Sequence, residues 1–172
     1  MKLSIREMTV FGMLGAIMFA SKILMELLPN VHLLGVLTVA YTVVYRKKAL
    51  YPIYTYVILN GIFSGFATWW IPYLYVWTIL WGVVMLLPED MPKKVQPVVY
   101  MTVCAVHGFL FGVLYAPVQA LLTGLNFNGM LAWIIAGIPF DVIQGISNFL
   151  CGTLIMPIVL TLRLAERGIW NR

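Results

Sequence analysis

The sequence predicts an all-α integral membrane protein with six transmembrane helices and both termini in the cytoplasm. The first observation is composition: 62% of the 172 residues are hydrophobic, 10% are charged, and the mean hydropathy is +0.95. The second is charge placement, because almost all charged residues lie in four short clusters between long apolar stretches. A helix needs roughly 20 apolar residues to cross a bilayer, so the length allows about six spans with short loops. We therefore expect a single transmembrane domain over residues 1–172.

Breaks at proline, asparagine, glycine and charge clusters divide the chain into six predicted spans. They cover residues 8–28, 31–45, 49–66, 69–87, 97–122 and 139–163. The second is short and is expected to tilt or to stop short of one surface. Between the last two spans, Met130 to Gly137 is apolar but too short to cross. We expect a short extra helix there, in the outer loop, which ends before Ile138-Pro139 because a residue preceding proline is pushed away from helical geometry.

The charged clusters determine the predicted orientation. They are Lys2, Arg6 and Glu7; Arg46, Lys47 and Lys48; Glu89, Asp90, Lys93 and Lys94; and Arg163, Glu166, Arg167 and Arg172. Placing all four on one side puts both termini there and requires an even number of spans. The positive-inside rule makes that side cytoplasmic. The basic residues are therefore interpreted as orientation signals and not as contacts to nucleic acid, with Lys22 as the exception that lies within a span.

The first predicted span combines a smooth stripe with a charged pair. Gly12, Ala16 and Ala20 repeat at spacing four, so another helix can approach closely, either within the same bundle or from a partner. Lys22 and Glu26, also four residues apart, project from a different side of the helix in its outer half. They either neutralise each other locally or contact a polar ligand that enters from outside.

The fourth predicted span begins with an aromatic run. An interfacial belt of aromatic residues accounts for Trp69 and Trp70, since indole rings favour the headgroup level. Trp77 and Trp81 lie about two and three turns deeper and share a helical face with Trp70 and Tyr73. We expect Trp70, Tyr73 and Trp77 to stack against a flat aromatic ligand.

A polar stripe follows the last predicted span. Asp141, Gln144 and Asn148 fall at i, i+3 and i+7, which places them on one face that descends from the outer surface. Asn60, in the outer half of the third span, is expected to face the same space. Polar residues on one stripe of an apolar span usually face a cavity or a partner. The alternative for Asp141 is a purely structural role, as an acid in the first turn of its own helix that complements the helix dipole.

The two histidines and the motif content argue against catalysis. We expect His107, within the fifth span, to be a hydrogen-bonded core residue, and His32, in an outer loop, to belong to a ligand lid or to be solvated. Two separated histidines without nearby acids do not make a metal site. The sequence has no Walker motif and no zinc-protease helix motif. We therefore predict that the chain is not an enzyme and holds no metal or cofactor of its own.

Two segments carry a resemblance to a known family. Ala16 and Ala20 fit an Ala-xxx-Ala pattern in a first membrane span. Residues 137–148, at the start of the last span, are similar to a Phe-Asp-x-x-His-x-x-x-Asn signature, except that Gln144 stands where the signature has His. In these features, and in size and predicted topology over its whole length, the chain resembles the S components, which are the substrate-binding membrane subunits of energy-coupling factor (ECF) vitamin transporters.

The resemblance implies partners, a location and a mechanism. Ala16 and Ala20, with Gly12 on the same stripe, would dock against a transmembrane coupling subunit that sits on two cytoplasmic ATPases. ATP would be used by these partner subunits and not by this chain. The S component would lie in a bacterial plasma membrane, surrounded by lipid, and would topple to carry its ligand across.

The predicted ligand is a small planar heterocycle with hydroxyl or amino groups. Vitamin B6 forms or a hydroxymethylpyrimidine precursor rank first, with cobalamin, pantothenate, folate and queuosine precursors behind them. The alternative function is a stand-alone secondary transporter in which Lys22, Glu26 and Asp141 would handle protons. An intramembrane enzyme is a third alternative, and the missing catalytic constellation argues against it.

Overall fold

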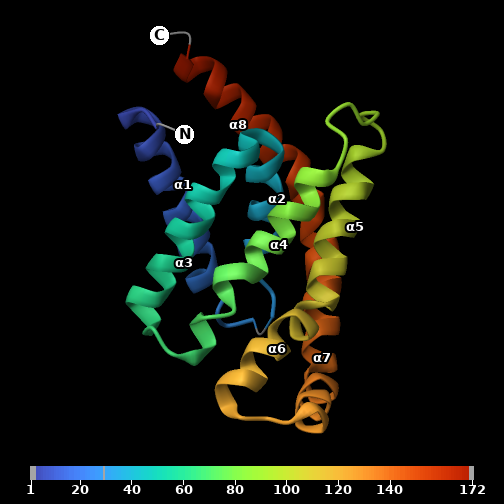
Figure 1. Cartoon of the computed structure of the whole chain (residues 1–172). Coiled ribbons are helices and arrows are strands. Elements are labelled where there is room, and N and C mark those ends of the chain that lie inside the picture. The colour runs from blue at the N-terminus through green and yellow to red at the C-terminus, as the bar shows by residue number, and fades with distance from the viewer. Residues whose placement is uncertain (1–2, 29, 171–172) are drawn as a thin grey trace.

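A computed structural model describes residues 3–28 and 30–170 (Figure 1). Regular secondary structure within those residues is entirely helical, which confirms the all-α prediction. The α-helices are α1 (Ile5–Leu24), α2 (Leu34–Tyr45), α3 (Leu50–Ser64), α4 (Tyr73–Leu86), α5 (Gln96–Phe109), α6 (Phe111–Thr123), α7 (Phe127–Cys151) and α8 (Ile155–Trp170). Short 3₁₀ helices are η1 (Arg46–Ala49), η2 (Thr68–Trp70) and η3 (Gly152–Leu154).

Four helical segments of the described chain are long and apolar enough to cross a membrane. They are Ile5–Leu24, Thr68–Leu86, Gln96–Thr123 and Phe127–Arg167. The predicted class, a multi-pass membrane protein, is thereby supported. α2 has 12 residues and α3 has 15, so each is shorter than the roughly 20 residues of a full helical crossing. The exact number of six spans stays a prediction.

The prediction that a helix ends before Pro139 is wrong. α7 continues without interruption through Pro139, so the predicted loop helix over residues 130–137 is the first part of α7. Proline cannot donate to the carbonyl oxygen four residues earlier, but membrane helices tolerate this where neighbouring helices compensate. Here α5 and α6 pack along α7. The start of α7 is fixed by Asn126, whose side chain accepts a hydrogen bond from the Gly129 N–H.

The predicted fifth and sixth spans are each divided. Residues 97–122 form α5 and α6, which meet at Leu110, and residues 139–163 are shared among α7, η3 and α8. At Leu110 the backbone leaves the helical conformation, with φ −97° and ψ 2°. α6 therefore begins with N–H groups that have no partner within the helix. The carboxylate of Asp141 on α7 accepts one of these N–H groups, that of Gly112.

α2 is the central helix of the bundle. It contacts α1, α4, α5, α7 and α8, and every residue from Leu34 to Thr42 is buried. Burial on all sides matches its composition, because a helix that is apolar all round belongs in the interior. Two closely packed helix pairs, α1 with α3 and α5 with α7, surround it (Figure 1).

The charged clusters gather at one end of the bundle, as far as they are described; Lys2 and Arg172 lie outside the described residues. Lys48 forms an ion pair with Glu7, and Arg46 forms one with Glu89 at 3.0 Å, which joins the first three clusters. Glu166, from the fourth cluster, lines the same groove as Lys48. Figure 1 shows that α1 begins and α8 ends here. We call this the charged end; the opposite end is formed by the α1–α2, α3–α4 and α6–α7 connections.

Candidate functional site

The centre of the candidate site is Trp77 on α4, which is 1% exposed. Aromatic rings from several segments surround its indole. Ring centroids 5.7 to 6.2 Å from that of Trp77 belong to His32, Tyr56, Tyr73, His107 and Phe111. They come from the α1–α2 connection, α3, α4, α5 and α6. Segments far apart in sequence therefore build one site, which we call the Trp77 cluster.

The Trp77 cluster contains several polar atoms without a partner in the chain. In the described residues, buried side-chain atoms with no hydrogen bond include His32 Nδ1, Tyr56 Oη, Trp77 Nε1 and His107 Nδ1. Most buried polar atoms in proteins are hydrogen-bonded, and each exception costs roughly 1–3 kcal/mol. Four such atoms, on Trp77 and on three rings in contact with it, indicate a place where a small molecule can supply the missing partners.

His107 has one ring nitrogen in use and one available. Its Nε2 lies 3.1 Å from the carbonyl oxygen of Val76. A carbonyl oxygen only accepts, so Nε2 carries the proton, and in a neutral imidazole Nδ1 is then an acceptor. The prediction of a hydrogen-bonded core histidine is confirmed for Nε2. It did not include the second nitrogen, which has no partner in the chain.

His32 lies in the connection between α1 and α2 and contacts Trp77 edge-on at 6.0 Å. Burial lowers the pKa of His32 from 6.5 to about 4, so its ring is neutral at physiological pH. The ring is half-buried and packs against Trp77, which does not match a fully solvated loop histidine. The connection instead places a neutral ring, with Nδ1 unpartnered, against one side of the cluster.

α3 contributes Tyr56 and Asn60, which lie one turn apart on the same helical face. Asn60 is 1% exposed and its Oδ1 has no partner in the described chain. Asn60 thus lies one turn from the Tyr56–Trp77 contact, toward the opposite end.

A line of aromatic rings leads from Trp77 to α7. Phe111 lies 5.8 Å from Trp77, Tyr115 stacks on Phe111 at 6.0 Å, and Trp133 stacks on Tyr115 at 5.8 Å. The Tyr115 hydroxyl donates to the carbonyl oxygen of Trp69 at 2.6 Å, which ties α6 to the segment before α4. These rings stack on one another and connect the Trp77 cluster to α7.

The aromatic residues predicted to face a ligand have different surroundings. Tyr73 and Trp77 contact each other within the cluster. Trp70 belongs to η2, and its Nε1 donates to the carbonyl oxygen of Val57 on α3 at 2.8 Å. Trp81 Nε1 donates to the carbonyl oxygen of Arg46 at the charged end. The structure thus brings Tyr73 and Trp77 into one site and directs the other two indole N–H groups elsewhere.

Asp141 on α7 caps the N-terminal end of α6. Both of its carboxylate oxygens accept the N–H of Gly112 at 3.1 Å. Gly112 is in the first turn of α6, where N–H groups lack helical partners and the dipole favours negative charge. The predicted structural role in the first turn of its own helix is wrong, because α7 begins at Phe127. Asp141 reaches the Trp77 cluster only through Phe111, the neighbour of Gly112.

Gln144 and Asn148 lie at the contact between α5 and α7. Asn148 Nδ2 donates to the carbonyl oxygen of Cys104 at 3.1 Å, and Gly35 of α2 approaches the same amide. Asn148 therefore joins three helices at their crossing. Gln144 is 2% exposed, its Nε2 has no partner in the described chain, and its backbone lies against Gly108 of α5.

Lys22 and Glu26 form an ion pair with each other, with Nζ and Oε1 3.2 Å apart. The Lys22 side chain is 24% exposed and that of Glu26 is 61% exposed. Among the described residues, neither takes part in the ring contacts or hydrogen bonds of the Trp77 cluster given above. The geometry matches the local pair, and contact with a ligand stays a prediction.

The small-residue stripe of α1 faces away from the bundle. Gly12 has open space where a side chain would lie, and Ala16 and Ala20 are exposed. The buried side of the helix is a different one, formed by Phe11, Leu14, Gly15 and Met18. Of the two predicted uses of the stripe, packing within the same bundle is therefore wrong.

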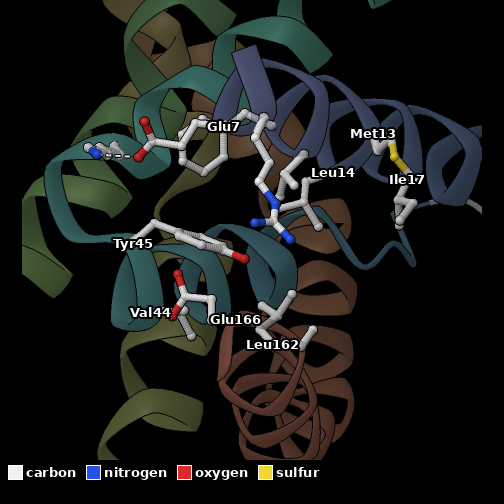
Figure 2. A pocket seen from close by; sticks show the side chains of 13 residues that line it. Glu7, Met13, Leu14, Ile17, Val44, Tyr45, Leu162 and Glu166 are labelled. Atoms are coloured by element: carbon white, nitrogen blue, oxygen red, sulfur yellow. Dashed lines mark hydrogen bonds and ion pairs between the residues drawn. The ribbon is translucent and has the colours of Figure 1, made fainter. Parts of the chain in front are cut away.

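Beside the stripe, a groove of about 580 Å³ opens between α1, the end of α2 and α8 (Figure 2). Met13, Ile17 and Leu162 contribute to its apolar wall, and Glu7 and Glu166 lie among its polar residues. The groove belongs to the charged end. It is a separate feature from the Trp77 cluster.

Comparison with known proteins provides no match from which a function of the site could be inferred. No family model, curated protein or solved structure matches the chain. Within the described residues, no group of three or more His, Cys, Asp or Glu side chains is placed to hold a metal ion. The arrangement offers flat ring faces with hydrogen-bonding atoms at their edges, which suits binding of a small aromatic molecule.

Tyr56, His32 and His107 were missed or underrated as site residues in the sequence. For Tyr56 a signal exists, since it precedes Asn60 by four residues and so shares its helical face. The two histidines give no comparable signal. Their role depends on contact with Trp77, and long-range packing alone produces that contact.

Proposed function

We propose that the chain is the S component of an ECF vitamin importer, which captures a B-type vitamin or precursor. The Trp77 cluster carries the proposal. It combines neutral aromatic rings with unpartnered polar atoms, and it lies under the α1–α2 connection, toward the end away from the charged clusters. A substrate-binding subunit needs a site that combines ring surfaces with a few polar atoms.

The distribution of charge supports the proposed orientation. The described members of all four clusters belong to the charged end, and the positive-inside rule assigns that end to the cytoplasm. Both termini would then be cytoplasmic, with six spans in which α2 and α3 are short. The Trp77 cluster would lie in the outer half of the bundle, within reach of a ligand outside the cell.

The exposed side of α1 supports docking of a coupling subunit. Gly12, Ala16 and Ala20 leave a smooth surface next to an apolar groove, so a partner helix can approach the backbone closely. Partner ATPases would supply the energy for toppling. A stand-alone proton-coupled transporter is the weaker candidate, because Lys22, Glu26 and Asp141 each already have a partner within the chain.

Ligand binding by the purified subunit tests the proposal. Native mass spectrometry of detergent-purified protein should detect a bound small molecule, and a thermal-shift panel of B-type vitamins and precursors should identify a stabilising one. Trp77→Ala should abolish that stabilisation. Trp81→Ala, one turn along α4, should lower stability but leave the ligand-induced shift. If no compound binds, or if both variants respond alike, the proposal fails.

Docking is tested separately. Ala16→Trp should prevent co-purification with a coupling subunit, because the indole fills the smooth stripe, and ligand binding by the isolated subunit should remain normal. Leu121→Trp is the matched control, since Leu121 is 83% exposed on α6, away from α1. Equal loss of co-purification in both variants would contradict docking through α1.

A further inference from the structure

The unpartnered atoms of the Trp77 cluster specify a hydrogen-bonding pattern. Trp77 Nε1 can only donate, whereas Asn60 Oδ1 can only accept. His107 Nδ1 is also an acceptor, because Nε2 must carry the proton that Val76 accepts. Tyr56 Oη can donate or accept. A molecule that satisfies these atoms therefore needs an acceptor on its rim and at least one N–H or O–H donor.

The cluster has no charged member that would compensate an anion. Its rings are indole, phenol, phenyl and imidazole, and burial keeps the His32 ring neutral with a pKa of about 4. The carboxylate of Asp141 lies outside the cluster, because it binds the N–H of Gly112, the residue that follows Phe111. A phosphate or carboxylate placed here would lose its hydration without a cation to pair with, which costs several kcal/mol.

The basic side chains lie elsewhere. The described Lys and Arg residues of the four clusters belong to the charged end, where Lys48 pairs with Glu7 and Arg46 with Glu89. Lys22 is the remaining cation, and its Nζ is paired with Glu26. A buried anion in the cluster would therefore depend on hydrogen bonds alone.

Shape restricts the ligand further. Trp77 is in contact with five rings, so a molecule hydrogen-bonded to its N–H would lie among aromatic side chains. Such walls favour a planar ring over a saturated or branched molecule.

From the hydrogen-bonding pattern of the site, its lack of charged side chains and its aromatic surroundings, we propose that it binds an uncharged nitrogen heteroaromatic ring with an amino or hydroxyl donor beside a ring-nitrogen acceptor. The site would reject phosphorylated or carboxylated forms of that ring. The inference rests on the proposed function, whose site it refines. The ring acceptor would take the Trp77 N–H, and the exocyclic donor would go to His107 Nδ1, on a ring in contact with Trp77.

Isothermal titration of the purified full chain tests this with three probes. The first is 4-amino-5-hydroxymethyl-2-methylpyrimidine, the second is its phosphate ester, and the third is the same ring without the amino group. We expect the phosphate to bind at least about 100-fold more weakly than the free pyrimidine. Loss of the amino group should weaken binding about 10-fold or more.

The His107→Phe variant supplies a second readout. It keeps a ring against Trp77 but removes the acceptor, so it should lose the preference for the amino compound and bind the compound without it nearly as before. Ligand-free melting temperature checks folding.

The outcomes separate the two proposals. Tight binding of the phosphate, or of a carboxylated vitamin, that Trp77→Ala abolishes would overturn this inference and leave the proposed function standing. Equal binding of the amino compound and its analogue would also overturn it. If no B-type vitamin or precursor binds, the proposed function fails, and this inference fails with it.

Discussion

The carboxylate of Asp141 joins two helices and can be tested at the scale of one residue. Asp141→Ala removes the acceptor for the Gly112 N–H, whereas Asp141→Asn keeps one. Loss of such a cap costs roughly 0.5–2 kcal/mol. We expect Asp141→Ala to lower the melting temperature of the detergent-purified protein, and Asp141→Asn to lower it less. A stable Asp141→Ala protein that fails to bind ligand would show instead that the carboxylate acts in the site.

His32 gives a second prediction at this scale. Its pKa is about 4 in the folded protein and 6.5 when exposed, so between these values the unfolded chain binds more protons. The stabilising contribution of the neutral ring is complete above pH 6.5 and is lost as the pH falls toward 4. At pH 5 the loss is about 2 kcal/mol.

Melting temperatures of the wild type and of His32→Gln, measured at pH 7 and pH 5, check this prediction. The decrease on acidification should be larger for the wild type. Parallel decreases would mean that other groups account for the pH dependence.

At the scale of helices, the close contact of α5 and α7 depends on Gly108. A Cβ atom there would lie 2.7 Å from Asn148 Nδ2 and 2.9 Å from the Cα of Gly145. Because backbone cannot move aside cheaply, Gly108→Ala should destabilise the protein by about 1–3 kcal/mol. Gly82→Ala on α4 is the control, since nothing lies within 4 Å of its Cβ. Gly82→Ala should be neutral or stabilise by up to about 1 kcal/mol. Similar melting temperatures for both variants would contradict the close packing.

Helix boundaries show what local sequence can and cannot specify. Long apolar runs and charge clusters are properties of the chain itself, and they predicted the membrane class and the grouping of charged residues. The continuous helix through Pro139 and the break at Leu110 depend on partners. α5 and α6 pack along the proline-containing helix, and Asp141 supplies the acceptor that lets a new helix start.

At the scale of the whole molecule, the residues of the candidate site form two groups, those that local sequence predicts and those that depend on packing between distant segments. Trp77 and Asn60 were predictable, because a bulky indole or a polar amide deep in an apolar span needs an interior partner. His32 and His107 were not, because α2 must first bring the loop and α5 against α4. Site residues that are unusual for their span can be read from sequence, and those defined by contact cannot.

The topology is the last property that belongs to the whole molecule. In a background with Cys104→Ala and Cys151→Ala, single cysteines at Ser64 and Asn128 would report on the opposite end, and one at Asp90 on the charged end; all three residues are exposed. If the charged end is cytoplasmic, a membrane-impermeant maleimide should label S64C and N128C in intact cells.

The same reagent should label D90C only after permeabilisation, because positive charge near short loops keeps them on the cytoplasmic side. The reverse pattern would invert the protein and place the Trp77 cluster toward the cytoplasm. Labelling of S64C and N128C from different sides would contradict the six-span arrangement itself, since the α3–α4 and α6–α7 connections share one end of the bundle in Figure 1. The experiment thus separates an error in orientation from an error in span number.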